Sequence, residues 1–314
     1  MLGLILGLII VVVGSELLSR SAEGISYELK GTYVVGSVLL ALTGNLPELA
    51  VSTSAVLRGH QEMAMASIIG SVAVNILIVM GLAALLGGWR SDLKFDNKKL
   101  QADLPMLIGA MGFFVFINLG RAEEIHLIDG LILLFTYLLL LRFMLFSHRE
   151  MYISHETIIT GKRRPLRYWI ALFLISAVMV IVGAEILVHE VKEIFIEYME
   201  LDEKFVGFTL LALAANLPEH MAVIKVAMKG NGEMAVGNAI GSASQAIYLI
   251  LGILILISIF TGNPLPTHLD LIYLAVFAIS VLITMVVVED GKLTWFEGWV
   301  CIVIYLLASA SIYY

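Results

Sequence analysis

One short peptide, Asn-Leu-Pro-Glu, occurs twice in this chain and constrains the fold more than any other feature. The first copy ends at Glu48 and the second at Glu219, each inside an apolar run long enough to cross a bilayer. A charged side chain at that depth costs about 3 kcal/mol or more unless it is paired, so it marks a functional site. Proline lacks a backbone donor and crowds the carbonyl four residues earlier. We therefore expect the helices to break at Pro47 and Pro218.

These breaks predict a cation site. The expected break at Pro47 frees the carbonyl of Thr43, and the break at Pro218 frees that of Ala214. Irregular backbone survives at membrane depth only where it is buried in protein or lines a cavity. Carbonyl oxygens beside a carboxylate are the hard ligands that Ca²⁺ and Na⁺ prefer.

The same residues also fit an ordinary helix cap. Asn followed three residues later by Glu, with Pro near the helix start, is a capping pattern in soluble proteins. Two observations favour the cation site. Glu48 is the only charged residue between Lys30 and Arg58, and the pattern is present in both halves of the chain.

Composition places the chain in a lipid bilayer. Of its 314 residues, 60% are hydrophobic and 14% are charged, and the mean hydropathy is +0.97, outside the range of soluble domains. The net charge of −7 is spread along the chain, and no basic patch indicates a nucleic-acid partner. Cys301 is the only cysteine, which excludes an intrachain disulfide.

Apolar runs of about 20 residues, the length that spans a bilayer, predict an all-α integral membrane protein with ten transmembrane helices. The runs are 1–18, 32–57, 63–86, 104–119, 126–146, 167–188, 205–228, 234–260, 269–288 and 294–313.

The basic residues predict the orientation. The loops after odd-numbered spans carry 15 of the 19 Lys and Arg residues, and they include the longest polar segment, 147–166. Because cytoplasmic loops are enriched in basic residues, we expect 147–166 to be cytoplasmic and both termini to be extracellular, in a cell membrane.

The two halves of the chain repeat each other. Residues 13–18 match 182–187 at an offset of 169, and 45–81 match 216–252 at an offset of 171. We therefore divide the chain into a five-helix repeat 1–146, a linker 147–166 and a second five-helix repeat 167–314. Since five is odd, the second repeat crosses the membrane upside down. Inverted repeats with broken helices at the midplane are typical of secondary transporters, whose site lies between the repeats.

Several further residues have two interpretations. The small residues Gly70-Ser71 and Gly241-Ser242 either pack helices closely or contribute to the site. Asn75 and Gln245 place amides in hydrocarbon, where they need partners and can offer oxygens to a cation.

Three ionisable residues are also ambiguous. Glu16 and Glu185 hold equivalent positions in the two halves. They are either protonation or gating residues, or interfacial side chains that snorkel to water. His220 either titrates near the site without binding the ion or is an ordinary buried histidine.

The motifs resemble those of the cation/Ca²⁺ exchanger superfamily, over nearly the whole chain. The Na⁺/Ca²⁺ exchangers of that superfamily typically have Gly-Thr-Ser-Leu-Pro-Glu in both repeats and an acid where this chain has Ala246. The chain is more similar to the H⁺/Ca²⁺ branch, with Gly44-Asn45 before the first glutamate, Asn216-Leu217-Pro218-Glu219-His220 in the second repeat, and Gly241-Ser242 followed by Gln245.

The resemblance implies a ligand set. Glu48 and Glu219 become the Ca²⁺ ligands and proton acceptors, completed by Asn45, Asn216 and nearby carbonyls. The full set of candidate metal-site residues is Glu48, Glu219, Asn45, Asn216, Thr43, Gly44, Ala214, Ala215, Ser71, Ser242, Asn75 and Gln245.

The predicted function is antiport. Two carboxylates buried together need one divalent cation or about two protons for neutralisation, so only loaded forms cross. We expect Ca²⁺ to be exchanged for H⁺, with Na⁺/Ca²⁺ exchange as the alternative and a passive cation channel as a further one. We expect no enzyme activity, because the sequence has no His-x-x-x-His or cysteine cluster for a catalytic metal. The oligomeric state stays open.

Overall fold

The structure is a computed structural model of the whole chain. It describes residues 1–28, 33–89, 91–120, 122–144 and 164–314, and of 33–42, 97–99 and 101–102 it describes the backbone alone. Most of the predicted linker 147–166 therefore lies outside the described residues.

The first half of the chain forms five helical stretches, and a π-helical segment joins α3 to α4. Its elements are α1 (Leu2–Glu28), α2 (Tyr33–Leu57), α3 (Gln61–Ala73), the π-helix η1 (Val74–Val79), α4 (Met80–Gly87), the short strand β1 (Leu93–Lys94), α5 (Asn97–Leu119) and α6 (Leu127–Arg142).

The second half has the same plan, with three π-helical segments. Its elements are α8 (Leu166–Val191), η3 (Lys192–Tyr198), α9 (Glu203–Val206), η4 (Gly207–Leu211), α10 (Ala212–Met228), α11 (Gly232–Gln245), η5 (Ala246–Leu251), α12 (Gly252–Phe260), α13 (Leu271–Asp290), the strand β2 (Lys292–Leu293) and α14 (Trp295–Tyr313).

Ten helical stretches in the described residues confirm the predicted fold class and span number. Seven of them are long and apolar enough to cross a membrane by length and composition. The first span was predicted too short, because α1 continues ten residues beyond residue 18. The extension keeps a buried stripe, formed by Leu18, Ala22 and Ile25 at helical spacing.

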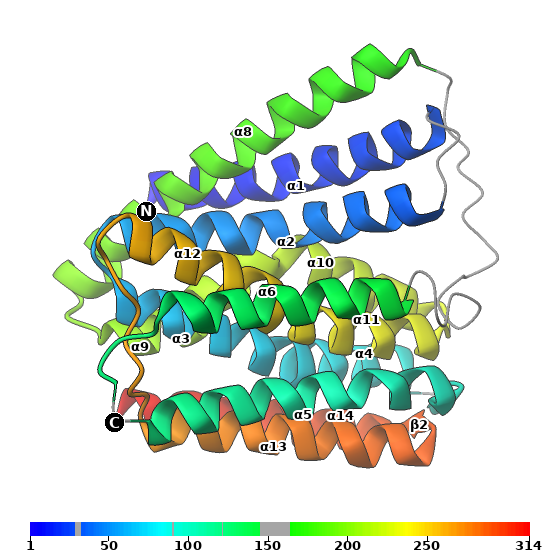
Figure 1. Cartoon of the computed structure of the whole chain (residues 1–314). Helices are drawn as coiled ribbons and strands as arrows, with labels where there is room; N and C mark the ends of the chain where they lie inside the picture. The colour runs from blue at the N-terminus through cyan, green and yellow to red at the C-terminus, as the bar shows by residue number, and fades with distance from the viewer. Residues whose placement is uncertain (29–32, 90, 121, 145–163) are drawn as a thin grey trace.

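The two halves run in opposite directions (Figure 1). The N- and C-termini lie at the same end of the bundle, as an even number of crossings requires. The second half starts with α8 at the other end, where α6 finishes, so α1 and α8 are antiparallel neighbours. The halves are also joined by β1 and β2, which pair antiparallel with Leu93 opposite Leu293.

The prediction that the prolines interrupt their helices is wrong. Pro47 lies inside α2 and Pro218 lies inside α10, and both helices continue through them. The irregular turns are π-helical instead, and η4 runs directly into α10. Local π-helical adjustment and neighbouring polar side chains are known ways for a membrane helix to tolerate a proline.

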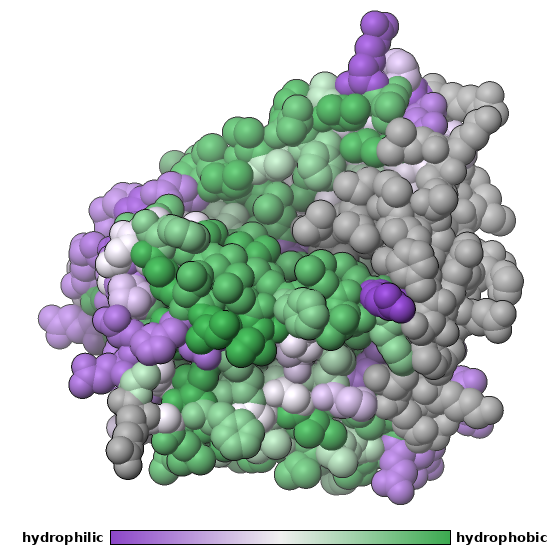
Figure 2. Space-filling view, viewed as in Figure 1, coloured by the Kyte–Doolittle hydropathy of each residue, from purple (hydrophilic) through white to green (hydrophobic). Residues whose placement is uncertain are grey.

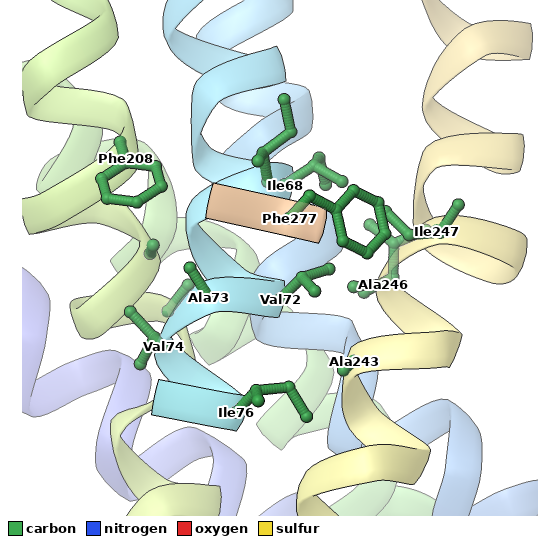
Figure 3. Close-up of a cluster of buried hydrophobic side chains, with 14 of the residues drawn as sticks. Ile68, Val72, Ala73, Val74, Ile76, Phe208, Ala243, Ala246, Ile247 and Phe277 are labelled. Carbon is green, nitrogen blue, oxygen red and sulfur yellow. The ribbon is translucent and has the colours of Figure 1, made fainter. Parts of the chain in front are cut away.

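The core lies around α3 and η1. Every residue of α3 from Met63 to Ala73 is buried, and its apolar side chains meet η4, η5 and α13 (Figure 3). The side of the bundle that shows α6 and α12 is broadly apolar, with hydrophilic residues at the end near the termini (Figure 2). This distribution suits a bundle whose side faces lipid and whose ends face water.

Candidate cation site

The two glutamates of the repeated motif lie inside the bundle, one from each half. The Glu48 side chain on α2 is 2% exposed, and Glu219 on α10 is partly buried. The two carboxylates are close enough to interact electrostatically. In the described part of the chain, no basic side chain pairs with either of them. One oxygen of Glu48, Oε1, has no hydrogen-bond partner there.

A hydrogen bond from the second repeat to the first fixes Asn216. Its amide Nδ2 donates to the hydroxyl of Ser71 on α3. The same nitrogen donates at 3.1 Å to the carbonyl of Ala212, one turn earlier on α10. With its donor group used in this way, Asn216 directs its Oδ1 acceptor elsewhere. Asn216 is 3% exposed and Ser71 is fully buried, so the contact lies in the interior.

The first repeat reaches the second through a matching contact. The Asn45 amide Nδ2 donates to Oε1 of Gln245, the last residue of α11. On that helix the Ser242 hydroxyl donates to Oε1 of Glu219. Each motif asparagine therefore contacts the helix that follows the opposite motif.

Two glycines allow the close approach that these bonds require. A Cβ on Gly70 would lie 2.3 Å from the carbonyl oxygen of Phe208 in η4. A Cβ on Gly207 would likewise lie 2.3 Å from the carbonyl oxygen of Met63 in α3. No side chain fits at either position, so α3 and η4 touch backbone to backbone. The close-packing interpretation is right for Gly70 but wrong for its equivalent Gly241, where a Cβ would meet nothing within 4 Å.

The remaining candidates differ in their surroundings. Thr43 and Ala215 are buried, and Ala214 is partly buried. Gly44 is exposed, and a Cβ there would also meet nothing within 4 Å, so the motif borders open space. Asn75 is buried in η1, and its Nδ2 has no hydrogen-bond partner among the described residues.

Glu16 on α1 and Glu185 on α8 each pair with an arginine. Glu16 forms an ion pair with Arg20 one turn later, at 2.8 Å, with both side chains more than half exposed. Glu185 pairs with Arg58 and accepts a hydrogen bond from Ser54, both on or beside the end of α2. Neither lies at a helix end, which removes the simplest form of the snorkelling interpretation.

His220 is 5% exposed, and its Nε2 has no hydrogen-bond partner in the described part of the chain. Sequence reasoning missed Ser54 and Arg58 as partners of Glu185. A signal was present, since Arg58-Gly59 and Lys229-Gly230 are equivalent in the repeat.

The donor set restricts the chemistry. No group of three or more His, Cys, Asp or Glu side chains that could hold a metal occurs among the described residues. The carboxylate pair is therefore accompanied by neutral amide and hydroxyl groups, from Asn45, Asn216 and Ser242. Oxygen-rich sites between inverted repeats are typical of secondary cation transporters.

The family is shown by comparison with known proteins. The profile described as "sodium/calcium exchanger protein" matches residues 1–146 and 168–314. The chain belongs to this family, which is one of cation transporters and not of enzymes. It is 27% identical over 292 residues to the Ca²⁺/H⁺ antiporter ChaA of Bacillus subtilis, which covers 89% of this chain and 83% of that protein.

Solved structures agree with the fold. The structure of native YfkE superposes with a TM-score of 0.79, at 22% identity, over 99% of this chain and 91% of that one. The sodium-calcium exchanger NCX_Mj superposes with a TM-score of 0.65, at 27% identity, over 98% of this chain and 97% of that one.

Proposed function

We propose that the protein is an antiporter that exchanges Ca²⁺ for H⁺ at a site formed by Glu48 and Glu219. The observation that carries the proposal is a pair of carboxylates inside the bundle, one from each repeat, which interact electrostatically and have no basic partner among the described residues. Two such charges are unstable together in a low dielectric, so either one divalent cation or about two protons must neutralise them. Loaded forms then cross between the two faces, and the empty charged form does not.

The surroundings of Ala246 support the proton over Na⁺. This residue occupies the position where Na⁺/Ca²⁺ exchangers carry an acid. Ala246 is fully buried, and Figure 3 shows it in an apolar cluster with Ile247 and Phe277. Several Na⁺ ions would need more oxygen ligands there, whereas protons need only the two carboxylates. The similarity to a Ca²⁺/H⁺ antiporter supports the same choice.

We further propose roles for the neutral residues. Asn45 and Asn216 are oriented across the repeats, so their amide oxygens and the carbonyls of Thr43 and Ala214 complete the ion's shell. The other candidates are Gly44 and Ala215 through their carbonyls, and Ser71, Ser242, Asn75 and Gln245 as ligands or as residues that position them.

The proposed organisation keeps the two repeats 1–146 and 167–314 with a cytoplasmic linker 147–166. Both termini are then extracellular. Cysteines introduced into 147–166 should react with impermeant thiol reagents only from the cytoplasm. Labelling from outside intact cells would overturn this topology.

The counter-ion is tested with purified protein in lipid vesicles. An imposed pH gradient should drive Ca²⁺ movement in the complete absence of Na⁺, and Ca²⁺ movement should in turn change the lumenal pH. Flux that is silent under a pH gradient and starts with a Na⁺ gradient would establish Na⁺/Ca²⁺ exchange instead. Ca²⁺ flow down its own gradient without any opposing ion would indicate a channel.

A further inference from the structure

An ion pair between Arg58, just after α2, and Glu185 joins the two halves of the chain at one end of the bundle. Arg58 contacts the carboxylate of Glu185 on α8, which also accepts a hydrogen bond from Ser54. His189, one turn further along α8, lies 3.5 Å from the Arg58 guanidinium. Because α2 carries Glu48, this contact ties α8 to a helix of the candidate site.

The repeat contains an equivalent set of residues at the opposite face. At the offset of 171, Ser54 corresponds to Lys225 and Arg58 to Lys229. The backbone is equivalent too, because the following glycines, Gly59 and Gly230, have φ angles of 82° and 81°. At the offset of 169, Glu185 corresponds to Glu16.

The equivalent contact is not made in this structure. Glu16 is paired with Arg20 of its own helix, and its side chain is 60% exposed. Lys225 and Lys229 are exposed and form no ion pair within the described residues. The packing has the same asymmetry: α8 lies extensively along α2, whereas α1 meets α10 at few residues.

The helices that carry Glu16 and Glu185, α1 and α8, are packed as one unit. A Cβ on Gly7 of α1 would lie 2.9 Å from the backbone nitrogen of Leu187, and a Cβ on Gly183 of α8 would lie 2.9 Å from that of Val11. Such close backbone contact favours movement of α1 and α8 together. Closing one face with this unit would then open the other.

We propose that Glu185 and Arg58 form one of two alternating latches on the α1/α8 unit. The second latch joins Glu16 to Lys229, with Lys225 beside it, and it closes the opposite face when the first latch opens. The state described here has the Arg58 face latched. This inference rests on the proposed transport function, to which it adds the residues that hold each end state.

Disulfide trapping tests the second latch. A disulfide forms only when the two Cα atoms come within about 7 Å of each other. In a Cys301→Ser background, the pair Ser54→Cys and Glu185→Cys should form a disulfide readily, because the short side chain of Ser54 is hydrogen-bonded to Glu185. The equivalent pair at the second latch, Glu16→Cys and Lys225→Cys, should form one more slowly, at a rate set by the population of the other state. Mass spectrometry of the joined peptides reads both reactions.

Weakening the first latch should favour the second. Exposed ion pairs contribute modestly, so adding Arg58→Gln should raise the rate of the 16–225 disulfide about two- to five-fold. The matched control Arg58→Lys keeps the charge and should leave that rate near the starting value. If Arg58→Gln does not fold, Glu185→Gln removes the same ion pair from its other side.

Two outcomes would overturn the latches: no 16–225 disulfide in any background, or an unchanged rate when the first ion pair is removed. Failure of the proposed function is a separate result. If vesicle assays show Na⁺ as the counter-ion, the trapping rates are unaffected, because they report the two end states and not the ion that is carried.

Discussion

The contact between Gly70 and the Phe208 carbonyl leads to a sharp prediction, because the repeat supplies its own control. A Cβ at residue 70 would be about 1 Å short of ordinary van der Waals contact with a backbone oxygen. The oxygen belongs to η4 and cannot rotate away as a flexible side chain would. The substitution Gly70→Ala must therefore shift α3 against η4, at a cost of about 1–3 kcal/mol, as in other overpacked cores.

The matched substitution is Gly241→Ala, at the equivalent position of α11. There a Cβ would meet nothing within 4 Å. Both substitutions gain the same helix propensity, about 0.5–1 kcal/mol, because alanine replaces glycine within a helix. The difference between the two variants therefore isolates the clash, and Gly241→Ala should be neutral or slightly stabilising.

Thermal unfolding of the purified protein in detergent is the assay. Gly70→Ala should lower the apparent midpoint by several degrees, while Gly241→Ala should leave it unchanged or raise it. The shift of α3 should also separate Ser71 from Asn216 and weaken Ca²⁺ binding. Equal midpoints for the two variants would refute the backbone-to-backbone contact between α3 and η4.

Two further predictions concern hydrogen bonds and charges. Asn216→Ala removes the donor to Ser71 and Ala212 in the interior, so the free energy of unfolding should fall by about 1–3 kcal/mol; wild-type stability in denaturant titrations would mean that the bonds are not formed. Asp270→Asn breaks the 3.0 Å ion pair with Lys204, and the Asp270 side chain is 61% exposed. The cost should stay below about 1 kcal/mol and shrink in high salt, and a large salt-independent loss would contradict a solvent-screened pair.

The sequence was sufficient for the fold class because membrane-spanning helices have a length fixed by the bilayer. The inverted arrangement followed from the offset repeats and the odd number of spans in each half. The end of α1 was missed because Arg20 and Glu23 interrupt its apolar run, although Leu18, Ala22 and Ile25 remain buried on the other face.

The local structure at the motifs was harder to predict. A proline signals that one backbone hydrogen bond is lost, but not how the helix adapts, and here the helices continue through Pro47 and Pro218. The contact of Asn216 with Ser71 depends on how α3 crosses η4, which only the packed structure specifies. Likewise, Gly70 and Gly241 are equivalent in sequence, yet only Gly70 is tightly packed.

The most direct test of the central claim is the number of protons displaced when Ca²⁺ binds. Calorimetric titration of the purified protein with Ca²⁺, in buffers of different ionisation enthalpy and without Na⁺, measures this number. At a pH where the empty site is protonated, we predict the release of about two protons per Ca²⁺, one from each carboxylate. Glu48→Gln and Glu219→Gln should each abolish tight binding while the protein stays folded. Tight Ca²⁺ binding without proton release, or near-normal binding by either variant, would contradict the proposed site.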